Sequence, residues 1–150
     1  MVYIDDHVQE VINDYLSGAE AELEKRRYYN VMNNGYDVYP KMLELALKLT
    51  DTENPLYKNL QVKRYYMLGV TCRLKMPLFE NSTWLLDSSF KMQQKAYELE
   101  PYAAYINNEM GILHHDKGKY IQAEEFFLTA TKIASSSVTP SPTARPRASS

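Results

Sequence analysis

The sequence predicts an all-α fold built from antiparallel pairs of helices, and three observations lead to this prediction. Apolar residues recur at spacings of three and four, as at Val8, Val11 and Ile12, which is the period of an amphipathic helix. Glycine and proline repeatedly interrupt this pattern, as they do in turns between helices. No stretch shows the sustained two-residue alternation of a half-buried strand.

The N-terminal part of the chain contains two expected helices. The first covers residues 4–15, where Asp5 and Asp6 lie in the first turn, a position that favours acidic side chains. The second covers residues 19–32, which are rich in helix formers. It ends at residues 33–35, an Asn-Asn-Gly sequence that can adopt left-handed backbone angles, so we predict a turn there.

The central part contains two further helices. From Tyr36 the helical pattern resumes, and Pro40 fits the first turn because no amide hydrogen is needed there. Residues 51–55 end this helix. The next helix covers residues 56–75, and Pro77 ends it.

The C-terminal part contains three expected helices. The first covers residues 80–100, and one of residues 81–83 (Asn, Ser, Thr) caps its start because these types accept hydrogen bonds from exposed amides. The other two cover residues 102–117 and 119–134, with Gly118 between them.

The composition changes abruptly after Ala134. Residues 135–150 contain three prolines and abundant serine, which leave almost nothing to bury in a core. We therefore expect one helical domain over residues 1–134 and a disordered tail over residues 135–150. The tail is either a docking or phosphorylation segment or a linker.

The charge distribution argues against a nucleic-acid partner. The 150-residue chain has a formal net charge of -2, and all 19 acidic residues precede the tail. Nucleic-acid binders need a basic face that releases counterions from phosphates, and no such excess of Lys and Arg occurs here. With 45% hydrophobic residues the composition is that of an ordinary globular domain.

The location predicted from the sequence is cytoplasmic. Cys72 is the only cysteine, so no intramolecular disulfide and no cysteine cluster for a metal can form, which suits a reducing compartment. No apolar run approaches the roughly twenty residues that span a bilayer. The first fifteen residues carry acids where a signal peptide carries lysines, so neither an export signal nor a membrane span is expected.

A repeat motif occurs near the C-terminus. Gly111 and Ala123 are small where two paired helices must approach closely, and Phe127 and Tyr120 are expected to fill the space beside them. The spacing of these residue types resembles the tetratricopeptide repeat (TPR) family, whose period is about 34 residues. The matching positions are Met110, Gly111, His114, Gly118, Tyr120, Ala123, Phe127 and Ala130.

Two weaker repeats precede this one, and the later of them contains extra residues around 75–81. Their matching positions are Tyr65, Leu68, Gly69, Cys72, Ser89, Ala96 and Pro101, and then Leu23, Tyr28, Gly35, Tyr36, Tyr39, Leu43 and Ala46. The resemblance thus covers residues 20–134. It implies about three degenerate repeats stacked as a short right-handed superhelix, an α-α solenoid, with residues 4–15 as an N-terminal cap.

The resemblance implies a protein-interaction module that binds a peptide or a partner helix. In this family the first helix of each repeat lines a concave groove. The projected positions are Lys63, Tyr66, Val70, Arg73, Tyr105, Asn108, Ile112 and His115. Two cations, two aromatic rings and an amide would suit an extended peptide with an acidic side chain or a C-terminal carboxylate.

No catalytic residue, cofactor or metal is predicted. The chain has no glycine-rich phosphate loop and no serine in a nucleophile elbow. His114, His115 and Asp116 are adjacent, so on a helix they point about 100° apart, whereas two zinc ligands on one face need a spacing of three or four. We expect His114 to pack in the interior and His115 to be exposed.

Two alternatives to a free-standing interaction module remain. The chain could be the regulatory or sensory appendage of a larger enzyme or signalling protein. It could also be a self-associating structural subunit, because no capping helix follows the last repeat and Phe126, Leu128 and Ile133 would leave apolar surface there. A homodimer would then form through the C-terminal helix.

Overall fold

Helices form nearly all of the computed structural model, which describes residues 2–16 and 37–137. These two parts contain six α-helices, one short 3-10 helix and no strand, so the all-α prediction is confirmed for them. The helix predicted over residues 19–32, the turn at 33–35 and the tail from residue 138 lie outside the described residues.

The helices agree with the predicted segments to within a few residues. Their bounds are α1 Val2–Leu16, α3 Val38–Lys48, α4 Pro55–Leu74, α5 Thr83–Leu99, α6 Ala104–Asp116 and α7 Tyr120–Ser137, with the 3-10 helix η2 at Met76–Leu78. Helix α7 continues past the predicted end at Ala134. Residues 135–137 are therefore helical and do not belong to the tail.

The helix ends follow from local chemistry. Asn54 caps α4, because its side-chain oxygen accepts a hydrogen bond from the Leu56 amide at 2.9 Å, and Pro55 occupies the first helical position. Between α6 and α7, Gly118 has a φ of 78°, a left-handed conformation that glycine adopts without strain. Ser82 lies at the start of α5, although its side chain makes no capping hydrogen bond there.

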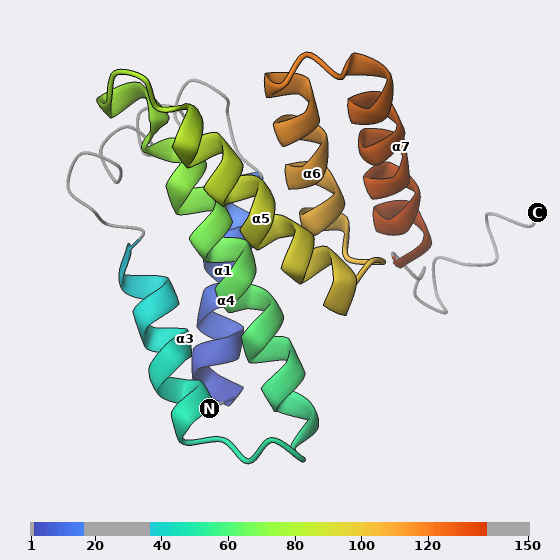
Figure 1. The fold of residues 1–150 in the computed structure, drawn as a ribbon. Helices are drawn as coiled ribbons and strands as arrows, with labels where there is room; N and C mark the ends of the chain where they lie inside the picture. Colours follow the sequence, from blue (N-terminus) through green and yellow to red (C-terminus); the bar gives the residue numbers. More distant parts are fainter. Residues whose placement is uncertain (1, 17–36, 138–150) are drawn as a thin grey trace, which may run out of the picture.

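The helices are arranged as neighbouring antiparallel pairs (Figure 1). Helices α4 and α5 pack against each other, as do α6 and α7, and α5 contacts α6. Helix α3 packs on the other side of α4. Helix α1, from the start of the chain, contacts both α3 and α4, and Figure 1 shows it behind them.

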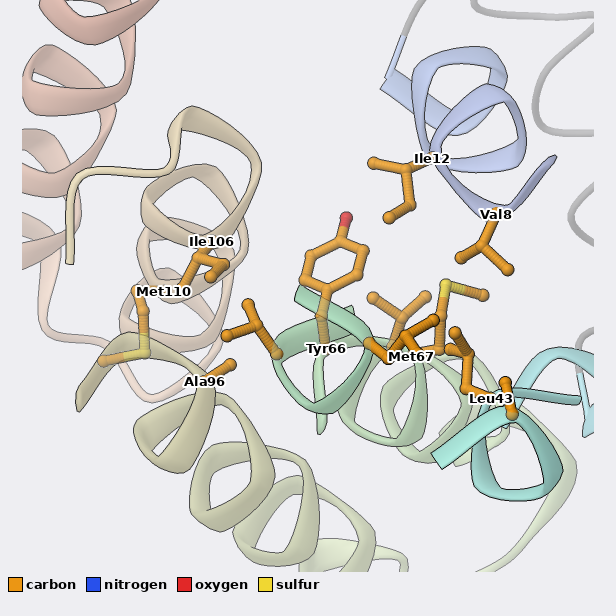
Figure 2. Packing of buried hydrophobic residues seen from close by; sticks show 12 residues of the cluster. Val8, Ile12, Leu43, Tyr66, Met67, Ala96, Ile106 and Met110 are labelled. Atoms are coloured by element: carbon orange, nitrogen blue, oxygen red, sulfur yellow. The ribbon is translucent and has the colours of Figure 1, made fainter. Parts of the chain in front are cut away.

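The core is formed by residues of α1, α3, α4, α5 and α6 (Figure 2). Helix α4 supplies its centre with Tyr66, a fully buried tyrosine. The side chains labelled around it in Figure 2 are Val8 and Ile12 of α1, Leu43 of α3, Met67 of α4, Ala96 of α5, and Ile106 and Met110 of α6. The core therefore joins the N-terminal helix to segments far along the chain.

Small residues allow close contact within both C-terminal helix pairs. A Cβ atom added at Gly111 would lie 2.6 Å from the ring of Phe127, and one at Gly69 would lie 2.6 Å from the amide of Gln93. Between α4 and α5 the contact is polar, since Ser89 donates to the Gly69 carbonyl at 2.6 Å. Gln93 also donates to the Tyr66 carbonyl, at 2.9 Å. The close approach predicted at Gly111 is thus present.

Substituting Gly111 with alanine is expected to lower the free energy of unfolding by about 1–2 kcal/mol. Displacing the Phe127 ring costs about 1–3 kcal/mol, and the better helix propensity of alanine returns up to about 1 kcal/mol. Urea unfolding followed by circular dichroism measures the change. In a Phe127→Leu background the same substitution should cost less, because the ring is gone; an unchanged cost would rule out this contact as the cause.

Candidate functional site

The structure places the eight predicted groove residues at very different depths. Three residues of α4 are buried, with exposed fractions of 7% for Lys63, 0% for Tyr66 and 1% for Val70. The remaining five are partly buried or exposed: Arg73, Tyr105, Asn108 and Ile112 are partly buried and His115 is exposed. The face of α4 predicted to be open to solvent is therefore covered.

Helix α1 covers part of this face. Val8 and Ile12, four residues apart on α1, are fully buried in the same cluster as Tyr66. Figure 2 shows the Tyr66 hydroxyl pointing toward Ile12, with Val8 beside Met67. The opposite side of α1 is exposed, so the helix is amphipathic and its apolar face is seated on α3 and α4.

A buried ion pair fixes one point of this contact. The Lys63 ammonium donates to a carboxylate oxygen of Asp5 at 2.6 Å, and the two side chains are only 9% and 14% exposed. Asp5 lies on the same face of α1 as Val8 and Ile12, because spacings of three and seven residues return to one side of a helix. Helix α1 thus meets α4 with one carboxylate followed by two aliphatic side chains.

Two tyrosines connect α4 to α6 beside this ion pair. The ring of Tyr105 packs edge-on against that of Tyr66, with centroids 4.8 Å apart. Burial raises the pKa of the Tyr105 hydroxyl above its usual range, and the nearby carboxylates of Glu100 and Asp5 add to the effect. The Tyr105 hydroxyl therefore stays neutral.

A second ion pair joins α4 to α6 further along the same face. Arg73 donates through Nε to one oxygen of Glu109, and its Nη2 lies 3.3 Å from the other oxygen. The Glu109 side chain is fully buried and that of Arg73 is 13% exposed. Because this guanidinium is already bound to a carboxylate in a two-point contact, it is not available in this structure to clamp an acidic peptide.

These contacts correct the expectation of an open groove. Lys63, Tyr66 and Val70 do share one side of α4 with Arg73, and Tyr66 does meet Tyr105, as the projection implied. The side is filled, however, by α1 near Lys63 and by α6 near Arg73. Sequence reasoning missed Asp5, Val8 and Ile12 as the residues that fill it, although their spacing was visible as an amphipathic pattern.

The remaining predicted residues lie apart from this contact. His115 is exposed near the end of α6, where its ring packs edge-on against Tyr120 at a centroid distance of 5.1 Å. Tyr120 is itself 64% exposed, so it does not fill the space between α6 and α7 as expected. Asn108 and Ile112 of α6 are partly buried.

His114, which was expected in the interior, is partly buried among aromatic rings. His114 lies between Phe90 and Phe126, with ring centroids 4.9 and 4.8 Å away, and its Nδ1 hydrogen-bonds the Met110 carbonyl at 2.8 Å. Cys72 is half-buried, and burial raises the pKa of its thiol, which disfavours the reactive thiolate. Over residues 2–16 and 37–137, no group of three or more His, Cys, Asp or Glu side chains is placed to hold a metal ion.

Some apolar side chains of the described helices are exposed away from this contact. Ile121 and Leu128 of α7 are 77% and 54% exposed, and Phe79 and Trp84 pair at the turn between α4 and α5.

Comparison of the chain with protein-family models, curated proteins and solved structures finds no match. None of the described helices has the length and apolar character needed to cross a membrane.

Proposed function

We propose that this chain is a non-catalytic protein-interaction module that binds a helix of another protein. Its binding surface is the side of α4 that carries Lys63 and Tyr66, together with Tyr105 of α6. We call this the Lys63 surface. The observation that carries the proposal is that an amphipathic helix, α1, already lies on this surface in the structure.

The architecture supports a helical repeat of the TPR type. Helix pairs α4/α5 and α6/α7 use the same arrangement, in which a glycine of the first helix receives a side chain of the second. Such units stack side by side, and together with α3 they would form part of a short right-handed superhelix. Arrays of this kind offer extended surfaces to peptides and helices.

The chemistry of the Lys63 surface suits a helix better than an extended peptide. An amphipathic helix presents anchors at spacings of three, four and seven residues, and α1 uses Asp5, Val8 and Ile12 in this way. The surface provides apolar contacts from Tyr66 and Met67 beside a single cation.

Binding in trans tests the proposal. Substituting Val8 and Ile12 with aspartate in the full chain should unseat α1; we call this variant the opened chain. A fluorescent peptide of residues 2–16 should then bind the opened chain saturably, as measured by anisotropy. It should bind the native chain far more weakly, since the attached α1 competes at a local concentration on the order of millimolar.

The matched control places aspartate at Val2 and Tyr3, which are 62% and 82% exposed. This variant should behave like the native chain. If the opened chain keeps its helical circular dichroism and still fails to bind the peptide, the surface does not receive helices in trans and the proposal is refuted.

A second candidate is self-association through α7, favoured by the exposure of Ile121 and Leu128. These residues are seven apart, so they lie on one side of α7, where a further repeat would stack. Light scattering of the full chain decides this candidate: a dimer that Leu128→Glu converts to a monomer supports it, and a monomeric native chain excludes it.

A further inference from the structure

Helix α1 makes a limited contact for an element of the core. Of its larger apolar side chains, only Val8 and Ile12 are fully buried. Ile4 and Val11 are partly buried against the core, and Val2, Tyr3 and Leu16 are 62%, 82% and 41% exposed. Its polar anchor is the ion pair between Asp5 and Lys63. A few anchors on one face are what a bound amphipathic helix shows in a groove.

The cation at the base of this contact is the unusual feature. Lys63 is 7% exposed, and lysine is almost never buried unless it is paired with a carboxylate. An apolar side chain at this position would have held an apolar helix equally well. A buried ammonium instead rejects any helix that brings no carboxylate, because the charge would be left desolvated and unpaired.

The Lys63 surface needs only one carboxylate from the helix that binds it. The other cation on this side of α4, Arg73, already contacts both oxygens of Glu109. The requirement therefore concerns a single position on the incoming helix. In α1 that position lies three residues before the first buried aliphatic side chain and seven before the second.

Resting on the proposed function, we propose that α1 is an internal occupant of the Lys63 surface and that the partner is a helix of another protein with the same chemistry. Such a helix carries Asp or Glu, then an aliphatic residue three positions later and another seven positions later, in the register of Asp5, Val8 and Ile12. The partner helix displaces α1, and it is recognised through the ion pair between its carboxylate and Lys63. Access to the surface is then limited by competition between the two helices.

The selectivity is tested with the opened chain, a set of labelled peptides of residues 2–16 and fluorescence anisotropy. Asp5→Asn in the peptide should weaken binding about 10- to 100-fold, the range expected for loss of a charge-assisted hydrogen bond. The control peptide carries Glu10→Gln, a change at an exposed position, and should bind like the native peptide.

A substitution in the chain separates recognition by Lys63 from an effect on the peptide helix itself. Lys63→Met keeps most of the side-chain length and removes the charge. In the opened chain with Lys63→Met, the native peptide should therefore bind no more tightly than the Asp5→Asn peptide, because its carboxylate now meets no cation. If the opened chain that keeps Lys63 binds the native and Asp5→Asn peptides equally, the proposed role of Lys63 is overturned. That result would leave the proposed function intact, whereas failure of every peptide to bind would refute the proposed function.

A designed peptide tests whether the surface takes helices other than α1. It is an alanine- and lysine-rich helix that shares only the Asp, Val and Ile register with α1, and its control has the Asp moved by one position. Binding of the first and not the second supports an external partner. Binding of the α1 sequence alone, or an opened chain that unfolds without peptide, would make α1 a fixed part of the core and overturn the inference.

Discussion

Replacing Tyr66 with alanine is expected to lower the free energy of unfolding by about 3–5 kcal/mol, the range for truncating a large buried aromatic side chain. Tyr66 is fully buried at the centre of the core, where its ring contacts Tyr105 and its hydroxyl points toward α1. The cavity left behind cannot close easily, because ion pairs from α4 to α1 and to α6 also hold these helices in place. Chemical denaturation followed by circular dichroism measures the loss.

The control for this prediction is Tyr102→Ala. Tyr102 is 77% exposed, so the same change in chemistry should alter the free energy of unfolding by no more than about 0.5 kcal/mol. Comparable losses for the two variants would mean that Tyr66 does not occupy the centre of the core.

Replacing Arg73 with leucine is expected to cost about 3–5 kcal/mol, because it leaves the fully buried carboxylate of Glu109 without its guanidinium partner. The unpaired charge, and not the loss of the attraction, is the main cause. The double variant Arg73→Leu/Glu109→Leu removes the charge as well and should recover much of the lost stability. The difference between single and double variants is read from the same denaturation experiment.

An exposed ion pair provides the comparison for Arg73. Lys48 and Glu44 are 3.8 Å apart with side chains 71% and 51% exposed, so Lys48→Ala should cost less than about 0.5 kcal/mol. A double variant at 73 and 109 that is less stable than Arg73→Leu would contradict the explanation, since it would show that the buried carboxylate is not what destabilises the single variant.

Periodicity was sufficient to predict the helices over residues 2–16 and 37–137, because each depends on residues three and four positions apart. Gly111 shows that even a contact between helices was visible, since a small residue opposite a large one within a pair is a local signal. The end of α7 was placed too early. The last three residues of α7 are Ser135, Ser136 and Ser137. Serine has only modest helix propensity, so the composition gave no reason to extend the predicted helix over them.

The candidate site was less accessible to sequence reasoning, because it depends on which segments meet in space. Lys63 and Asp5 are 58 positions apart, and nothing in either neighbourhood indicates the other. Arg73 was projected as a peptide-binding cation, but Glu109, one position from the projected Asn108, is the residue that it contacts. The spacing rules gave the correct side of α4 and could not show that other helices of the chain cover it.

The order of α1 and α4 along the chain also has a consequence for synthesis on the ribosome. The carboxylate of Asp5 is translated 58 residues before the ammonium that it pairs with. At about 5–20 residues per second, the delay is about 3–12 s. During that interval α3 can already be present, but the part of the surface that α4 supplies is missing, so the face of α1 that carries Val8 and Ile12 is only partly covered while the chain is being made.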